Sequence, residues 1–264
     1  PPAWYPEHHI IIHTGAPVAR IEPAAHRFVL AEGSTVSYDR LLVATGARSF
    51  IPPIEGVDLP GVFGLWTIED ATRIRAYARD CKRAVVIGGG LLGLEAARGL
   101  RILGLEVTVL EFMPRLKAGE AVSRGAYSRL LEAGVATRFL GYHKTAASSQ
   151  VRLIAAGGRP NLALAQASGL NTNKGIVVDS HLMTSAADVY AAGDVAEYAG
   201  AVYGIVPAAI EQAQVAAHHM AEIDTRAYAG TVPTNTLKIV GVDLTSVGQI
   251  AGAELLAGAV GDRP

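Results

Sequence analysis

The hydrophobic pattern of the first 46 residues is that of short strands. Four runs are separated by turn residues: HIIIH (9–13), PVARIEP (17–23), HRFVLAEG (26–33) and TVSYDRLLVATG (35–46). Runs of this length and composition predict three or four strands in a meander, ending in a buried strand at 41–44. The proline- and glycine-rich stretch at 49–61 predicts a connector between two structural units.

From residue 67 the pattern changes to helices that alternate with strands. The stretch TIEDATRIRAYARD (67–80) places apolar residues on one helical face and acidic residues in its first turn. The segments that follow are predicted as strands at 84–87, at 106–110 and from Val135, and as helices at 91–103 and 121–133. Such alternation predicts a parallel sheet with helices on its faces.

Beyond residue 174 the chain alternates again. Strands are predicted at GIVVD (175–179) and DVYAAGD (188–194), and an alanine-rich helix at 207–220 has proline in its first turn. The stretch TNTLKIVGVDLTSVGQI (234–250) predicts the beginning of another set of strands.

Charge and hydropathy exclude two classes of partner. The 264 residues include 23 Lys and Arg against 24 Asp and Glu, which gives a formal net charge of −1. Neither nucleic acid nor an anionic membrane surface is therefore expected as a partner. No apolar run approaches the roughly 18 residues that would indicate a transmembrane helix.

Cysteine and histidine point to no special chemistry. The single cysteine, Cys81, excludes an internal disulfide and a Cys-x-x-Cys pair within this sequence. We interpret it as an ordinary thiol and expect a cytoplasmic location. The eight histidines show no ligand spacing with cysteines or carboxylates, so no metal site is expected. The opening residues, PPAWYPEHH, contain neither an initiator methionine nor a signal-peptide pattern.

The sequence GGGLLG (88–93) is the strongest chemical signal in the chain. It fits G-x-G-x-x-G, follows a predicted strand and opens a predicted helix, and an acidic residue follows about 20 residues later at the end of the next strand. This context predicts a dinucleotide site, and the alternative is a purely structural bend. The predicted binding residues are Gly88, Gly89, Gly90, Leu91, Leu92, Gly93 and Glu111.

Each glycine has a separate physical role in that prediction. Gly88 permits the sharp turn, Gly90 lets backbone N–H groups approach a pyrophosphate, and Gly93 lets the helix pack closely on the strand. Glu111 is expected to accept hydrogen bonds from the adenosine ribose and to repel a 2′-phosphate, which favours NADH over NADPH. Arg115 weakens that preference.

Five motifs in one order carry a family resemblance: YDRLLVATGA (38–47), VVIGGGLLGLEAA (85–97), GGRPN (157–161), VYAAGDVAE (189–197) and LKIVGVDLTSVG (237–248). The chain resembles FAD-dependent pyridine nucleotide oxidoreductases with the glutathione-reductase fold, and most of all their rubredoxin reductase and NADH-dependent nitrite reductase branch. The resemblance implies an α/β fold with two Rossmann-like domains. The implied domains are a discontinuous FAD domain (1–66 and 175–226), an NAD(H) domain (67–174) and the beginning of a C-terminal α+β interface domain (227–264).

The resemblance also implies roles for residues outside GGGLLG. Asp194 would hydrogen-bond a ribityl hydroxyl of FAD, and Gly193 would give the backbone access to its phosphates. Thr45 and Gly46 would approach the nucleotide half of FAD, and Gly157 would lie against the nicotinamide ribose. The alternative for Asp194 is a carboxylate that only ends a strand.

Two further features follow from the same resemblance. Glu95 would face the nicotinamide end of the coenzyme as the candidate catalytic residue, although it can also be read as a solvated helix residue. The helix that begins near Pro207 would direct its positive end at the flavin. The implied activity passes hydride from NADH to FAD, and then electrons to a rubredoxin, a ferredoxin or a nitrite-reducing domain.

The sequence departs from such relatives at its start. They begin with their own strand, G-x-G-x-x-G turn and helix for the ADP half of FAD, and nothing before Pro1 supplies these. We expect the sequence to be part of a longer chain; the alternative is a truncated protein. Two other functions stay open at this point, namely a non-catalytic NADH-binding or NADH-sensing module and a flavin-free dehydrogenase.

Overall fold

The computed structural model describes residues 4–111, 135–139, 149–224, 226–239 and 242–247. The chain forms two compact units, and each contains segments that are distant in sequence. Unit 1 comprises Pro1–Ala47 and Pro160–Thr231, and unit 2 comprises Arg48–Arg159 and Val232–Pro264. These bounds differ by up to about twenty residues from the predicted domain limits at 66, 174 and 226, and the cofactor assigned to each domain stays a prediction.

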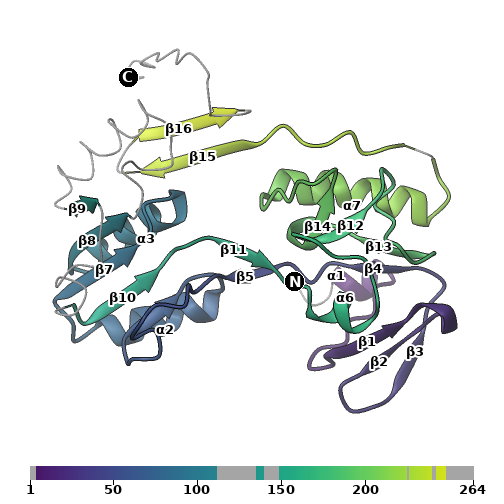
Figure 1. Ribbon diagram of the computed structural model, residues 1–264, viewed down its shortest axis with the longest axis horizontal. Coiled ribbons are helices and arrows are strands. Elements are labelled where there is room, and N and C mark those ends of the chain that lie inside the picture. The colour runs from purple at the N-terminus through teal and green to yellow at the C-terminus, as the bar shows by residue number, and fades with distance from the viewer. Residues whose placement is uncertain (1–3, 112–134, 140–148, 225, 240–241, 248–264) are drawn as a thin grey trace. The chain divides into compact units, whose positions relative to one another are not determined.

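Unit 2 contains a parallel sheet of five strands in the order β6-β10-β7-β8-β9 (Figure 1). The chain passes from β7 outward to β8 and β9, then returns to place β10 on the other side of β7. Ligands of such sheets bind where the order reverses, at the carboxyl ends of the strands. The strands are β6 (Val62–Gly64), β7 (Arg83–Ile87), β8 (Glu106–Glu111), β9 (Val135–Phe139) and β10 (Val151–Ile154).

Two described helices accompany this sheet, and both were predicted. Helix α2 (Ile68–Ala78) begins with a capping box, because the Thr67 side chain accepts from the Asp70 amide while the Asp70 carboxylate accepts from the Thr67 amide. Helix α3 (Leu91–Ile102) buries one apolar face on β7 and β8. The helix predicted at 121–133 lies outside the described residues.

Unit 1 combines an antiparallel meander with parallel strand pairs. Strands β1 (Val18–Glu22), β2 (Arg27–Leu30) and β3 (Thr35–Ser37) form the meander. Strand β4 (Leu41–Val43) pairs in parallel with β13 (Val189–Ala191), and β12 (Ile176–Val178) pairs in parallel with β14 (Ala196–Tyr198). The α/β fold class predicted from the sequence is therefore confirmed.

Helices and short turns complete unit 1. Helix α7 (Val206–Met220) buries Ala208, Gln212, Val215 and Ala216, which share one face at helical spacing. The smaller elements are α1 (Trp4–Glu7), η1 (Pro23–Ala25), α6 (Ala163–Ala167) and η2 (Gly193–Val195).

Two strand predictions in unit 1 need correction. The run HIIIH (9–13) is not a strand: the chain leaves α1 in an irregular conformation, and Ile11 is 83% exposed. A strand requires a neighbouring backbone, and among the described strands none pairs with this run. The strand predicted at 188–194 ends at Ala191, because Gly193 has a φ of +80° and turns the chain into η2.

The remaining strands form two short pairs. Strand β5 (Ala47–Ser49) pairs with β11 (Gly158–Pro160), and both lie at sequence positions where the chain passes between units. Strands β15 (Thr234–Ile239) and β16 (Val242–Val247) form an antiparallel pair in the stretch predicted to begin new strands.

Candidate functional site

The glycine turn of unit 2 is built from close backbone approaches. Gly88 has a φ of +116°, and a Cβ atom there would lie 2.4 Å from the Ala155 carbonyl oxygen. A Cβ atom on Gly93 would lie 2.0 Å from the Gly88 carbonyl oxygen. The Gly88 amide donates to the Leu110 carbonyl at 2.8 Å. The turn therefore fits between the ends of β7, β8 and β10 only with glycine at both positions.

Gly90 differs from these two glycines because, among the described residues other than its chain neighbours, no atom lies within 4 Å of where its Cβ would be. It is the N-cap of α3 and provides no side-chain cap, and Leu91 and Leu92 follow in the first turn. The first N–H groups of a helix lack partners within the helix and carry its positive dipole end. Open space beside such a helix start suits an anion such as a pyrophosphate.

Glu111 ends β8 beside this turn. Its side chain is buried, and its Oε2 accepts a hydrogen bond from the Gly89 amide at 2.7 Å. The strand that carries Glu111 and the strand that precedes Gly89 are neighbours in the sheet, so their carboxyl ends meet. The acidic residue predicted for ribose recognition therefore lies in contact with the glycine turn.

Glu95 and Gly157 occupy other positions of unit 2. Glu95 is an exposed residue of α3, one turn after Leu91. Gly157 follows β10 with a φ of +92°, and its carbonyl accepts from the Phe50 amide at 2.8 Å. Within the described part of the chain, no atom beyond its chain neighbours lies within 4 Å of its Cβ position. Because β10 borders β7 at the point of order reversal, Gly157 belongs to the same carboxyl edge as the glycine turn.

Unit 1 presents a second set of predicted residues at the carboxyl ends of β4 and β13. Thr45 and Gly46 follow β4, and three hydrogen bonds hold them to Asn161. The Asn161 amide donates to the Gly46 carbonyl at 2.9 Å, its Nδ2 donates to the Thr45 carbonyl at 2.8 Å, and the Thr45 hydroxyl donates to the Asn161 carbonyl at 3.3 Å. In the sequence, Asn161 was noted only as the last residue of the motif GGRPN (157–161).

Gly193 and Asp194 follow β13 at the same edge of the strand pair. The Gly193 amide donates to Oε1 of Gln212 on α7 at 2.8 Å. Asp194 is half-buried, and within the described part of the chain its carboxylate has no hydrogen-bonding or ion-pair partner. An unpartnered, half-buried carboxylate suits recognition of a ligand hydroxyl, which is the group that FAD offers through its ribityl chain.

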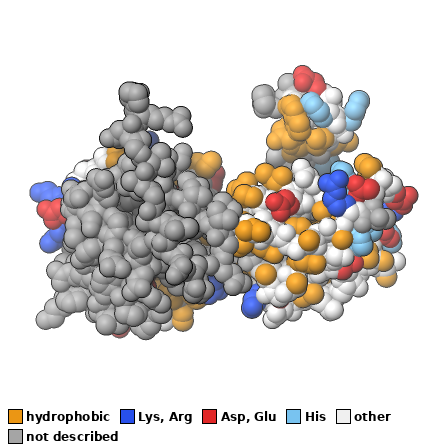
Figure 2. Space-filling model, turned by 90° about the horizontal axis from the view of Figure 1, so that it is seen from above, with side chains coloured by type: hydrophobic (Ala, Val, Ile, Leu, Met, Phe, Trp, Pro, Cys, Tyr) orange, Lys and Arg blue, Asp and Glu red, His pale blue; other side chains and the backbone are white. Residues whose placement is uncertain are grey.

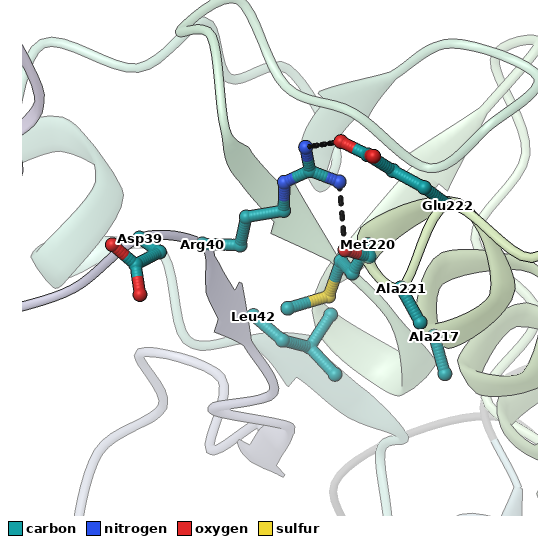
Figure 3. A pocket seen from close by; sticks show the side chains of 7 residues that line it. All are labelled: Asp39, Arg40, Leu42, Ala217, Met220, Ala221 and Glu222. Atoms are coloured by element: carbon teal, nitrogen blue, oxygen red, sulfur yellow. Dashed lines mark hydrogen bonds and ion pairs between the residues drawn. The ribbon is translucent and has the colours of Figure 1, made fainter.

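A pocket of about 570 Å³ in unit 1 lies at the opposite ends of these strands (Figure 3). Arg40 directly precedes β4, and Asp188 directly precedes β13, so both mark the amino ends. The pocket therefore does not contain Thr45 or Asp194. It is lined by Asp39, Arg40, Leu42, Ala217, Met220, Ala221 and Glu222.

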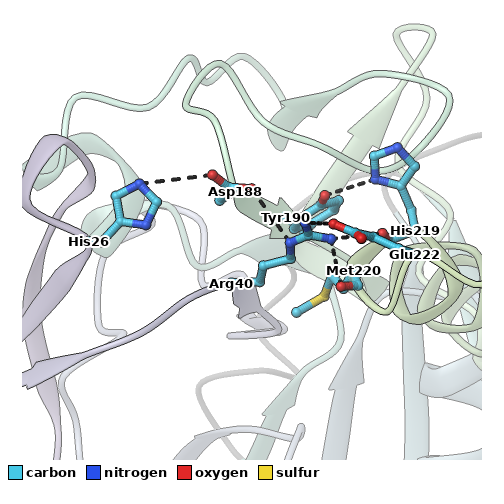
Figure 4. A network of polar contacts seen from close by, with 7 residues as sticks. All are labelled: His26, Arg40, Asp188, Tyr190, His219, Met220 and Glu222. Carbon is cyan, nitrogen blue, oxygen red and sulfur yellow. Dashed lines mark hydrogen bonds and ion pairs between the residues drawn. The ribbon is translucent and has the colours of Figure 1, made fainter.

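A polar network beside the pocket caps the C-terminus of α7 (Figure 4). Arg40 donates to the carbonyls of His219 and Met220 at 3.1 and 2.6 Å, and it forms an ion pair with Glu222. Its Nε lies 3.6 Å from Asp188, which in turn lies 3.9 Å from His26. A cation that binds terminal carbonyls stabilises a helix end, so this network has a structural role.

The described residues also bear on metals and membranes. No group of three or more His, Cys, Asp or Glu side chains in the described part of the chain is placed to hold a metal ion. The helices described here include none of the length and apolar character needed to span a bilayer. On the described part of the face in Figure 2, acidic, basic and apolar side chains are interspersed.

Together, the order of the five-stranded sheet and the glycine turn define an α/β dinucleotide-binding protein. The family described as pyridine nucleotide-disulphide oxidoreductase matches residues 5–219, and the chain belongs to that family.

Individual relatives agree with this assignment. The nitrite reductase (NAD(P)H) of Bacillus subtilis (strain 168) is 35% identical over 273 residues, which cover 95% of this chain and 34% of the relative. The rubredoxin-NAD(+) reductase of Alcanivorax borkumensis is 33% identical over 246 residues, which cover 84% of this chain and 63% of the relative. The family resemblance inferred from the five motifs is thus confirmed.

A solved structure agrees as well. The ferredoxin reductase from Rhodopseudomonas palustris superimposes with a TM-score of 0.86 and 28% sequence identity, over 97% of this chain and 69% of that chain. This chain spans about a third of the nitrite reductase and about two thirds of the rubredoxin reductase.

Proposed function

We propose that this chain forms the nucleotide-binding part of a flavoprotein oxidoreductase that uses NADH and FAD. Bound FAD would supply the acceptor for a hydride from NADH, and the electrons would pass to a rubredoxin, a ferredoxin or a nitrite-reducing domain. Membership in the family and the names of the relatives support this proposal. The observation that carries it is the pair of glycine turns at the carboxyl ends of parallel strands, one beside Glu111 and the other beside Asp194.

In this proposal unit 2 binds NADH. The backbone from Gly88 to Gly93 holds the pyrophosphate at the start of α3, and Glu111 accepts a hydrogen bond from the adenosine ribose while Gly89 holds it in place. A buried carboxylate at this position repels the negative charge of a 2′-phosphate, so NADPH should bind more weakly than NADH. Gly157 leaves room for the nicotinamide ribose, and Glu95 is the candidate residue at the nicotinamide end.

Unit 1 binds FAD in the same proposal. Asp194 accepts a hydrogen bond from a ribityl hydroxyl, and Gly193 presents a backbone without a side chain to the phosphates. Thr45 and Gly46, held by Asn161, contribute the neighbouring backbone. The positive end of α7 favours negative charge on a bound flavin.

The absorption spectrum of the purified protein tests this function. We expect a yellow protein with flavin absorption bands in the visible region that bleach on anaerobic addition of NADH, and more slowly with NADPH. Asp194→Ala should lower the FAD content, whereas Asp39→Ala, at the amino end of β4, should not. A colourless protein that still binds NADH would instead be an NADH-binding module, and the flavoenzyme proposal would be wrong.

We also propose that the protein resides in the cytoplasm. The single cysteine suits a reducing compartment. Cell fractionation with detection of the protein by antibody tests this location, and recovery in a membrane or extracellular fraction would contradict it.

A further inference from the structure

Among the described residues, Gln212 is the most deeply buried polar side chain near the candidate FAD site. It lies in the middle of α7 with 1% of its surface exposed, and its Oε1 accepts from the Gly193 amide at 2.8 Å. Gly193 can only donate through its N–H, so the side-chain oxygen must point toward it. A buried amide used in this way ties α7 to the turn that carries Asp194.

A directional series of hydrogen bonds fixes the orientation of this side chain. Gln212 Nε2 donates to the Tyr228 hydroxyl at 3.4 Å, which lies 2.6 Å from the Thr231 hydroxyl, and Thr231 donates to Glu211 at 2.5 Å. The carboxylate of Glu211 can only accept a hydrogen bond, so the Thr231 hydroxyl donates its proton to Glu211. The contact between Tyr228 and Thr231 must then have Tyr228 as its donor. The Tyr228 oxygen is then left to accept from Nε2, which directs Oε1 to Gly193.

The turn around Asp194 is held on three sides. The Ala192 amide donates to the Val43 carbonyl at 3.2 Å, the Gly193 amide donates to Gln212, and Val195 is fully buried in the core of unit 1. The Asp194 side chain is the group in this turn without a partner among the described residues. Of the three attachments, only the one to Gln212 depends on a polar side chain.

We propose that Gln212 is a positioning residue for FAD: through the Gly193 amide, it holds the turn that aims the Asp194 carboxylate at the ligand. The inference rests on the proposed function, because it assigns FAD to this turn. It adds a residue outside the glycine motifs and extends the site to Tyr228 and Thr231, at the point where the chain leaves unit 1.

FAD binding by the intact protein tests the proposal. FAD is removed, titrated back and followed by quenching of flavin fluorescence, and folding is followed separately by circular dichroism. Gln212→Met removes both hydrogen bonds at similar volume and should weaken FAD binding about tenfold. Gln212→Glu keeps an acceptor for Gly193 and should lose less affinity. Gln214→Met makes the same change at an exposed position of α7 and should change nothing.

The outcomes separate this inference from the proposed function. If the wild-type protein binds FAD and Asp194→Ala weakens binding while a folded Gln212→Met does not, the positioning role is wrong and the function stands. If Gln212→Met does not fold, Tyr228→Phe decides, because it removes only the hydroxyl that orients Gln212; unchanged FAD affinity in that variant overturns the proposal. If the wild-type protein binds no FAD, both fail.

Discussion

The Gly89 amide donates a hydrogen bond of 2.7 Å to the carboxylate of Glu111, which links the glycine turn to the end of the neighbouring strand. Glu111 therefore has a structural partner in addition to its proposed ligand. A carboxylate has two oxygens and about four acceptor positions, so one side chain can hold Gly89 and also accept from a ribose hydroxyl. The turn and the ribose-binding group are thereby positioned together.

Gly93→Ala tests the close packing of α3 on the turn. The new Cβ would lie 2.0 Å from the Gly88 carbonyl oxygen, so we expect a loss of about 3 kcal/mol in the free energy of unfolding, together with loss of NADH binding. Gly99→Ala on the same helix places its Cβ where no atom from other described elements lies within 4 Å, and it should stabilise the protein by about 1 kcal/mol. Denaturant unfolding measures both, and equal effects would contradict the packing argument.

Gly90→Ala separates binding from folding. The backbone of Gly90 is extended (φ −76°, ψ 177°), which alanine also adopts, and no atom of the described residues beyond its chain neighbours lies within 4 Å of the Cβ position. We expect the free energy of unfolding to fall by no more than about 1 kcal/mol, because alanine is a poorer N-cap than glycine. The added methyl group would occupy the space assigned to the pyrophosphate, so the Kd for NADH should rise about tenfold or more. Calorimetric titration with NADH measures this Kd. An unchanged Kd would show that the pyrophosphate does not bind beside Gly90.

Glu111→Ala tests coenzyme choice. Removal of the carboxylate should weaken NADH binding about tenfold, because a hydrogen bond to a charged group is lost, and should narrow the difference between NADH and NADPH. Glu106→Ala, at the exposed amino end of the same strand, is the matched control and should leave both affinities unchanged. A constant ratio of the two affinities in Glu111→Ala would remove Glu111 from ribose recognition.

The lowered pKa of Glu197 predicts that the stability of the protein depends on pH. Burial raises the pKa of this carboxyl, but hydrogen bonds from the Gly175 amide, the Asn173 side chain and the Lys174 amide outweigh it and hold the pKa below its ordinary value of 4.5. A lowered folded-state pKa stabilises the protein above the unfolded-state pKa, and this contribution is lost as the pH falls through the folded value.

Thermal unfolding of Glu197→Gln between pH 7 and pH 3 measures this effect. At neutral pH we expect the variant to be about 1–3 kcal/mol less stable than wild type, because the buried amide donors lose a charged acceptor. The two melting temperatures should converge as the pH falls below about 4.5. A difference that stays constant over the whole range would assign the stabilisation to packing alone.

Much of unit 2 could be predicted because its signals are local. Strand β7, the glycine turn and helix α3 are contiguous, and their apolar spacing and glycine positions indicate a strand–turn–helix directly. The capping residues Thr67 and Asp70 likewise mark the beginning of α2 within four positions.

Other elements were missed or misplaced because their partners are distant in sequence. Strands β6 and β10 have only three and four residues, too few to display a period, and they exist because they pair in parallel with each other across about ninety positions. The run HIIIH has strand composition and yet is not a strand, since pairing rather than composition decides. Asn161 gave no signal in the sequence beyond its place in the motif GGRPN (157–161).

The sequence alone determined the order of the motifs, the α/β class and the glycine positions at which the backbone must turn sharply. These features follow from backbone freedom and hydrophobic spacing, which act over a few residues. Only the tertiary structure decided that Gly89 meets Glu111, that Asn161 holds Thr45 and Gly46, and that Gln212 holds Gly193. Each of these contacts joins segments brought together by sheet order and helix packing. Their distances depend on burial and pairing of the whole unit, which no local pattern encodes.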